Sequence, residues 1–486
     1  WDLVFGVPSM SKLYELPAHV LLALYASGQA SPVDCTREVL ERIGHLNPLL
    51  NAFCFIDEQG AIESARESET RWLAWRKQRE TGFGGANAPR ALEGVPVSIK
   101  DLILTKGWPT LRGSKTIDPK QDWSVDAPVS ARLREAGAVV LGKTTTPEFG
   151  CKGETNSPLT GITKNPWHLQ KTPGGSSGGA AAAVAAGLGP LAVGTDGAGS
   201  VRIPAAFCGN VGLKPSYGRV PAYPLSPFGS VAHLGPHTMS VIDCALAMNV
   251  MKQADARDWT SLPPDTSNYL IGLDDGLAGL RVAYSPRLGY VQQLDPAIEA
   301  AVKETAHAME SLGARVEAVD PGIEDSLDIS FGLWAAGAAN LWRQLSDEQR
   351  AVTDPDFRSE ATIGLAINPE QIHDFNQRRG ILGSTLRQFM SRFDLILTPS
   401  TAVCAFDTRA AGSAGLYDAQ TMLGWTPFSF PFNLSQQPAI SFPWSLNPDG
   451  LPIGIQLVGP MFGDALVLRA ARALESIRPV KRPNAL

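Results

Sequence analysis

Hydrophobic positions near the start of the chain recur with the spacing of an amphipathic helix. Ser31 is a residue favoured at a helix N-cap, and Pro32 after it is favoured in the first helical turn. Apolar residues follow at positions 39, 40 and 43, and the pattern predicts a helix that ends at the break Asn47–Pro48. A second, highly charged helix is expected over residues 58–79, and a Gly-, Asn- and Pro-rich loop over residues 82–91.

After that loop the pattern changes from a helical to a strand-like period. Apolar residues at 95, 97 and 99 alternate with Pro96, Ser98 and Lys100. The alternation predicts a short strand with Lys100 at its end, on the face opposite the aliphatic side chains. We therefore expect the backbone to hold Lys100 in one position.

Helix and strand patterns continue to alternate along the chain. This alternation is typical of an α/β protein. No internal repeat and no convincing boundary is visible, so residues 1–486 are expected to form a single domain. The further segments are a helix at 126–137, strands at 138–141, 280–284 and 394–398, and a long exposed connection at 255–275.

Composition and charge exclude several classes of protein. Apolar residues make up 44% of the chain and charged residues 19%, which indicates a globular protein. The net charge is −6 and there is no long run of Lys and Arg, so nucleic acid is not an expected ligand. The most apolar stretch, residues 180–193, is interrupted by Gly and Pro and is too short to span a bilayer. No membrane association is expected.

The cysteine pattern and the first residue give indications of the cellular location of the protein. The six cysteines are scattered and form no CxxC pair, so neither a zinc site nor a disulfide framework is indicated. We expect buried thiols and a cytoplasmic location. The sequence begins at Trp1 rather than Met, which leaves open a preceding segment or a removed signal.

The most unusual segment is rich in Gly and Ser. Residues 174–179 read Gly-Gly-Ser-Ser-Gly-Gly and lead into four alanines, so a tight loop is expected at the start of a helix with exposed N–H donors. A second Gly-rich turn over residues 195–200 follows the predicted strand 191–193. Its consecutive amides can converge on one carbonyl oxygen, as in an oxyanion hole. One predicted helix and one predicted strand connect the two segments. The chain can therefore fold back on itself and bring Ser176 and Ser200 to the same pocket.

A serine nucleophile needs a base, and the sequence places no obvious histidine near either serine. The seven histidines are dispersed along the chain. Lys100 is the alternative, because burial in a neutral pocket lowers the pKa of a lysine by up to about 3–5 units and leaves a proton-accepting amine.

At these positions the chain resembles the amidase signature family. The family is marked by a GGSSGG loop, a second serine in a D-x-x-G-S turn, and a lysine on a preceding strand, matched here by Ser176, Ser200 and Lys100. The resemblance extends from the Ser31 helix to residues 451–456. It implies a mixed, twisted central β-sheet covered by helices on both faces, with a signature core at about 90–220 and a substrate-lining part at about 330–460.

The resemblance also implies roles for the residues. Ser200 attacks the carbonyl carbon, Ser176 passes its proton to Lys100, and water then hydrolyses the acyl-enzyme. The peptide bond Gly175–Ser176 is expected to be cis, and no cofactor or metal is implied. The oxyanion hole is formed by the backbone amides of Gly197, Ala198, Gly199 and Ser200. Supporting positions are Ser177, Asp196 and Arg202, with the last two paired to brace the turn.

One departure from the family pattern concerns Ala198. Many members have Gly at this position. The amide donor is kept, but a positive φ would be penalised for Ala.

Two other motifs point to different chemistry. Residues 137–144 fit the phosphate-binding pattern GxxxxGK[ST], but a predicted helix precedes them, a predicted strand lies inside them, and Pro147 follows at once. Residues 174–178 fit the nucleophile elbow GxSxG of α/β-hydrolases, yet the residues before them are loop-like. A further alternative is one subunit of an amidotransferase, which transfers ammonia to a charged transfer RNA with partner chains.

The substrate is less well defined by sequence. An aromatic segment at 424–432, with Trp334 and Trp342, lines an apolar pocket or belongs to the core. In the first case an aryl or otherwise hydrophobic amide is favoured, and the same chemistry accepts carbamates (urethanes) and activated esters. We predict a small-molecule amidase or arylamidase that acts as a monomer or homodimer.

Overall fold

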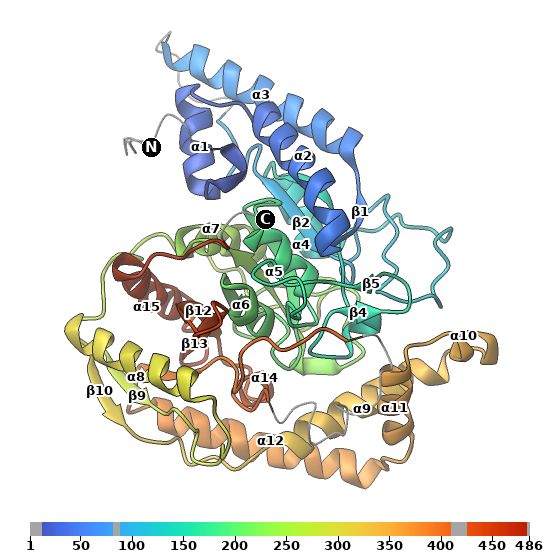
Figure 1. Ribbon diagram of the computed structural model, residues 1–486, viewed down its shortest axis with the longest axis vertical. Helices are drawn as coiled ribbons and strands as arrows, with labels where there is room; N and C mark the ends of the chain where they lie inside the picture. The colour runs from blue at the N-terminus through green and yellow to red at the C-terminus, as the bar shows by residue number, and fades with distance from the viewer. Residues whose placement is uncertain (1–11, 81–87, 410–424, 484–486) are drawn as a thin grey trace.

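The computed structural model describes residues 12–80, 88–409 and 425–483. Its centre is a sheet of eleven strands in the order β1-β3-β2-β6-β8-β7-β12-β13-β11-β9-β10, and a small pair, β4-β5, lies apart (Figure 1). The α/β class predicted from the sequence is confirmed. The strands are β1 (Phe53–Ile56), β2 (Pro96–Lys100), β3 (Val139–Thr144), β4 (Asn156–Ser157), β5 (Gly161–Ile162), β6 (Leu191–Asp196), β7 (Val211–Lys214), β8 (His233–Thr238), β9 (Arg281–Tyr284), β10 (Arg315–Ala318), β11 (Leu395–Pro399), β12 (Ala439–Leu446) and β13 (Pro452–Val458).

The sheet is mixed. Strands β3, β2 and β6 run parallel to one another at one side, and β11, β9 and β10 do so at the other. The strands between these groups pair antiparallel, from β6 through β8, β7, β12 and β13 to β11. Both parallel groups need crossover connections, which helices supply.

Helices cover both faces of this sheet. On β6, Ala192 packs with Ala180 and Val184 of the helix α5, while its neighbours Leu191 and Val193 belong to the main hydrophobic core. Successive strand residues point to opposite faces, so helices on both faces are required to bury them. The helices are α1 (Ala18–Ser27), α2 (Pro32–Leu50), α3 (Glu58–Glu80), α4 (Pro128–Glu135), α5 (Gly178–Ala185), α6 (Arg202–Cys208), α7 (Val241–Met251), α8 (Pro296–Ser311), α9 (Leu327–Arg343), α10 (Asp347–Ala351), α11 (Pro355–Leu365), α12 (Pro369–Met390), α14 (Phe430–Leu434) and α15 (Asp464–Ile477).

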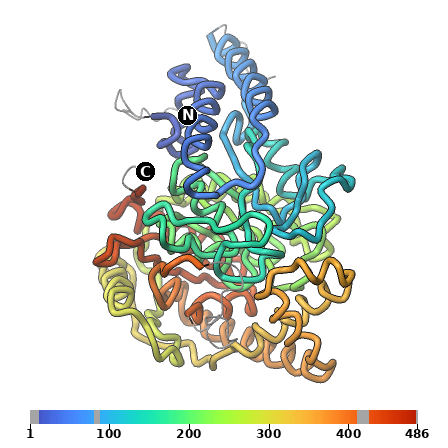
Figure 2. Tube along the Cα trace, turned by 45° about the vertical axis from the view of Figure 1, so that its right-hand side comes forward, coloured from blue at the N-terminus to red at the C-terminus, as the bar shows by residue number. Residues whose placement is uncertain are grey.

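Two groups of helices lie at opposite ends of the molecule. The N-terminal helices α1, α2 and α3 lie at one end, and α9, α11 and α12 lie at the other (Figures 1 and 2). The second group encloses its own hydrophobic cluster, to which Phe149, Phe228 and Trp334 also belong. The strands that carry the predicted site residues lie between these two ends.

Helix α2 corrects one prediction. The helix continues through Pro48 to Leu50 instead of ending at Asn47–Pro48. Pro48 lies in the last turn, where a missing N–H costs only one helical bond. The Asn47 side chain accepts hydrogen bonds from the amides of Ala52 and Phe53, which stabilises the end of the helix.

The segment that fits the phosphate-binding pattern is part of the sheet, as the sequence context indicated. Gly142, Lys143 and Thr144 lie in β3 and are buried, and Lys143 donates to the Ile103 carbonyl at 2.6 Å. A phosphate loop needs exposed amides before a helix, so this segment is not one.

Other expectations are met in part. The strands predicted at 138–141, 280–284 and 394–398 correspond to β3, β9 and β11, whereas most of the loop predicted at 82–91 lies outside the described residues. The cysteines Cys35, Cys151, Cys208 and Cys244 are buried, Cys404 is partly buried and Cys54 is exposed. No helix in the described ranges combines the length and the apolar character needed to cross a membrane.

Candidate active site

Lys100 ends strand β2 and is fully buried. Val97 and Ile99 of the same strand pack in the main core, and side chains alternate along a strand, so Lys100 faces the other side of the sheet. There its amine contacts three hydroxyl groups, at 2.7 Å from Ser176 Oγ, 2.9 Å from Ser177 Oγ and 2.8 Å from Thr195 Oγ1. Lys100 thus joins the Gly-Ser segment to the end of β6.

Burial lowers the pKa of Lys100 well below its usual value, while the Asp196 charge acts in the opposite direction. None of the three groups that contact the amine is charged. The amine is therefore neutral at a pH where a free lysine is protonated, and it can accept a proton.

The Gly-Ser loop brings Ser176 and Ser177 to the start of α5. The peptide bond Gly175–Ser176 is cis, as expected. The Ser177 hydroxyl donates to the Thr195 carbonyl at 3.0 Å and accepts from the Thr195 amide at 3.1 Å. The Ser177 amide donates to the Ser200 carbonyl at 3.2 Å. These bonds fasten the loop to the end of β6 and to the turn that carries Ser200.

The turn after β6 is braced by a buried ion pair. Arg202 donates through Nε and Nη2 to the two oxygens of Asp196, each at 2.9 Å. Burial by itself would raise the pKa of Asp196, but the Arg202 charge and its hydrogen bonds lower it well below the usual range. Arg202 also donates to the side-chain oxygens of Gln456 at 2.8 Å and Asn433 at 2.6 Å. The pair therefore fixes the turn against the C-terminal part of the chain.

One of the four predicted oxyanion donors is already engaged. The Gly199 amide donates to Asp196 Oδ1 at 2.9 Å, so it is not free for a substrate oxygen. Within the described ranges no hydrogen bond engages the amides of Gly197, Ala198 and Ser200. These three remain as the donors expected for an oxyanion. Ala198 does not adopt a positive φ, so the substitution of Gly by Ala at this position carries no backbone penalty.

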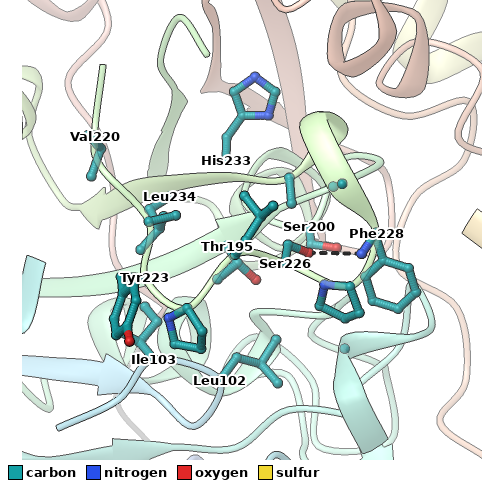
Figure 3. Close-up of a pocket in the computed structure, with 18 of the residues that line it drawn as sticks. Leu102, Ile103, Thr195, Ser200, Val220, Tyr223, Ser226, Phe228, His233 and Leu234 are labelled. Carbon is teal, nitrogen blue, oxygen red and sulfur yellow. Dashed lines mark hydrogen bonds between the residues drawn. The ribbon is translucent and has the colours of Figure 1, made fainter. Parts of the chain in front are cut away.

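Both serines open into one cavity of about 130 Å³, lined by Ser176, Thr195, Gly197 and Ser200. Lys100 does not line it, so the Ser176 hydroxyl stands between the amine and the cavity. Figure 3 shows part of this lining, with Ser200, Thr195 and Phe228 among the labelled residues. The apolar walls are formed by Leu102, Ile103, Phe149, Val220, Tyr223, Leu225, Phe228 and Leu234.

Histidine is not part of the hydroxyl network. His233 lines the cavity, but its Nδ1 lies 2.8 Å from the Val231 carbonyl. His237 is fully buried, and burial lowers its pKa to about 3. Neither ring forms a hydrogen bond to Ser176 or Ser200 in the described structure. Among the described residues, no group of three His, Cys, Asp or Glu is placed to hold a metal ion.

The aromatic segment at 424–432 belongs mainly to the core. Phe428, Phe430 and Phe432 are fully buried and do not line the cavity, and Gly424 lies outside the described residues. Of the two tryptophans considered with this segment, Trp334 lines the cavity and Trp342 does not. Apart from Trp334, the apolar lining therefore comes from Phe149 and from residues 102–103 and 220–234, which the sequence pattern did not single out.

The comparisons with known proteins agree with this geometry. The sequence model of the family described as Amidase matches residues 34–468. The chain belongs to the amidase signature family. It is 37% identical to an acylamidase of Rhodococcus erythropolis over 96% of both chains. It is 33% identical to a glutamyl-tRNA(Gln) amidotransferase subunit from Chloroflexus aggregans, over 98% of this chain and 99% of that protein.

A solved structure extends the likeness to the whole fold. A bacterial aryl acylamidase of the amidase signature family superposes with a TM-score of 0.86 at 30% identity, over 96% of both chains. The activity of the present amidase is accordingly cleavage of an amide carbon–nitrogen bond.

Some contacts in this amidase site were not predicted from the sequence. Thr195 was noted only as part of the Gly-rich turn, yet its hydroxyl contacts the Lys100 amine. Asn433 and Gln456 contact Arg202 from more than 200 positions along the chain. A contact between polar residues so far apart in the sequence leaves no periodic pattern from which it could be predicted. Only the fold brings these groups together.

Proposed function

We propose that this amidase hydrolyses aryl and other hydrophobic amides through an acyl-enzyme on Ser200. Lys100 acts as the base and Ser176 relays the proton. The observation that carries the proposal is the fully buried Lys100 amine, which lies 2.7 Å from the Ser176 hydroxyl. Ser176 lines the same cavity as Ser200. The hydroxyl relay is needed because Lys100 itself does not reach that cavity.

The steps follow from this arrangement. As Ser200 Oγ forms a bond to the carbonyl carbon, its proton moves to Ser176 Oγ, and the Ser176 proton moves to Lys100 Nζ. The carbonyl oxygen becomes an oxyanion, for which the amides of Gly197, Ala198 and Ser200 are the donors. Return of the proton through Ser176 to the amide nitrogen breaks the carbon–nitrogen bond. Water then attacks the ester on Ser200 by the same relay.

The walls of the cavity favour a hydrophobic substrate. Leu102, Ile103, Phe149 and Phe228 provide apolar and aromatic surface beside the serines. Carbamates (urethanes) and activated esters present the same carbonyl with a leaving group that Ser176 can protonate. We include them in the proposed substrate range. No partner chain, cofactor or metal is needed for these steps, and we propose a cytoplasmic monomer or homodimer.

The test is release of 4-nitroaniline or 4-nitrophenol from an anilide, a carbamate and an ester. Ser200→Ala, Ser176→Ala and Lys100→Ala should each lower kcat/KM by about 10³-fold or more while the thermal melt stays cooperative. Activity that survives Ser200→Ala contradicts the nucleophile assignment. Ser177→Ala is the matched comparison, because its hydroxyl also contacts Lys100 but does not line the cavity.

The likeness to the amidotransferase protein favours a second candidate function. A protein of that kind acts with partner chains. In that case the purified chain would leave every anilide, carbamate and ester intact until its partner chains were added. Turnover by the purified chain alone excludes this alternative.

A further inference from the structure

A second, smaller cavity is also lined by Ser200. It has a volume of about 30 Å³, and its walls include Cys151, Ala198, Ile203, Ser330 and Thr426. It shares Gly150, Ser200 and Trp334 with the large cavity. Ser200 therefore lies at the junction of two spaces of very different size.

The proton relay opens to only one of these spaces. Ser176 and Thr195 line the large cavity, and neither lines the small one. In the proposed mechanism the leaving nitrogen takes its proton from Ser176. The amine half of the substrate must therefore lie in the large cavity, within reach of that hydroxyl.

The acyl half leaves the reacting carbon in a different direction from the amine half. Both substituents of the reacting carbonyl start from the carbon attacked by Ser200, so the acyl substituent points away from Ser176. The small cavity is lined by Ser200 and not by Ser176, and it is bounded by Ala198, whose amide is an expected oxyanion donor. We propose that this small cavity is the acyl subsite and that it restricts the enzyme to short acyl groups on large amines. This inference rests on the proposed function.

The size of the small cavity sets the restriction. The small cavity has about a quarter of the volume of the large one, about 30 Å³ against about 130 Å³. That space suits the methyl or ethyl of an acetyl or propionyl group, and a longer chain would have to displace packed side chains. Ile203 and Cys151 are 3% and 2% exposed, so these walls are part of the packed interior.

Trp334 is the wall between the two cavities, and several contacts hold it in place. Its ring stacks on Phe228 with a centroid distance of 3.7 Å, and its indole N–H donates to Glu360 at 3.3 Å. A Cβ atom added at Gly197 would lie 2.6 Å from the ring, so the indole packs directly on the turn that carries Ser200. The two cavities are therefore separated by a fixed side chain.

The first test is a pair of substrate series. In one, the amine is always 4-nitroaniline and the acyl group grows from acetyl to propionyl, butyryl, hexanoyl and benzoyl. We expect kcat/KM to fall by about tenfold or more for each methylene beyond propionyl. In the other, the acyl group is always acetyl and the aryl amine grows, and we expect little loss. A flat acyl series, or a size limit on the amine instead, overturns the assignment.

Two variants change the small cavity in opposite directions. Ile203→Ala enlarges it and should raise the relative kcat/KM for butyryl and hexanoyl substrates by about tenfold or more. Ser330→Val fills it and should lower kcat/KM for propionyl more than for acetyl substrates. Ser330 lies on α9, so this variant tests the proposal even where Ile203→Ala does not fold.

The matched comparison is Leu225→Ala. Leu225 lines the large cavity alone. This variant should change KM for large amines and leave the order of the acyl series as it is. An acyl series changed equally by Leu225→Ala and Ile203→Ala would contradict separate subsites. If Ser200→Ala kept its activity, the proposed mechanism itself would be wrong. If Ser200→Ala were inactive and the acyl series were flat, the mechanism would stand and only the subsite assignment would be wrong.

Discussion

At the scale of single residues, the proposed mechanism depends on the charge of Lys100. The amine is surrounded by the hydroxyls of Ser176, Ser177 and Thr195, and burial lowers its pKa well below 10.5. A protonated amine could still donate to these hydroxyls but could not take a proton from Ser176. The proposed mechanism therefore requires the deprotonated form.

This requirement predicts the direction of the pH dependence. Because the pKa of Lys100 is lowered in the folded enzyme, kcat/KM should already be at its plateau at a pH where a free lysine is still protonated. It should fall as the pH is lowered through that pKa and the amine takes up a proton. Lys100→Arg should reduce kcat/KM by about 10³-fold at every pH, because a guanidinium stays protonated. A Lys100→Arg enzyme with the wild-type pH profile would rule out Lys100 as the base.

At the scale of elements, the turn between β6 and α6 holds the expected oxyanion donors. Gly199 has φ of +120°, and a Cβ atom there would lie 2.5 Å from Ser429 Oγ and 2.7 Å from Ile203 Cδ1. Ala198 beside it has no positive φ and tolerates a side chain. Position 199 therefore requires glycine, whereas position 198 accepts a residue with a side chain.

Exchange of side chains at these positions tests the turn. Gly199→Ala should destabilise the protein by about 1–3 kcal/mol and lower kcat/KM by about 10²-fold, because the amides of the turn must shift. Ala198→Gly should cost no more than about 1 kcal/mol and change kcat/KM only a few-fold. Thermal melts and anilide kinetics measure both. Equal effects of the two substitutions would be inconsistent with the geometry described.

The same elements show which features a sequence pattern can predict. The strand ending at Lys100, the Gly-Ser loop and the serine turn are predictable because each is a short segment with its own period or motif. The engagement of the Gly199 amide by Asp196 is not, because it depends on one rotamer inside the turn. The wall from Val220 to Leu234 is also missed, since a Pro-rich connection carries no periodic signal. The division into domains stays a prediction.

At the scale of the whole molecule, a buried ion cluster joins the site to the C-terminal helices. Lys152 follows Gly150 and Cys151, which line the small cavity beside Ser200. Its amine contacts Asp354 at 2.8 Å and Asp356 at 2.6 Å, at the start of α11. The side chains of Lys152 and Asp354 are fully buried. Lys152 also lines the small cavity beside Ser200. Helix α11 in turn packs on α9, which carries Trp334.

Loss of this cluster should affect stability more than any surface pair. Lys152→Met leaves two buried carboxylates without their cation and should destabilise the protein by about 3–5 kcal/mol. Lys171→Met, which removes an exposed pair with Asp407 at 3.0 Å, should cost no more than about 1 kcal/mol. Urea denaturation of both variants gives the comparison. Equal losses would show that the cluster does not connect the two parts of the fold.

The most direct test of the account is to trap the acyl-enzyme and locate it. The protein would be incubated with 4-nitrophenyl acetate, or with an aryl carbamate whose acyl-enzyme hydrolyses slowly, then quenched in acid and measured by intact-mass and peptide mass spectrometry. We predict one acyl group per chain, on the peptide that contains Ser200, and none in Ser200→Ala. An acyl group on Ser176, or one that remains in Ser200→Ala, would contradict the account.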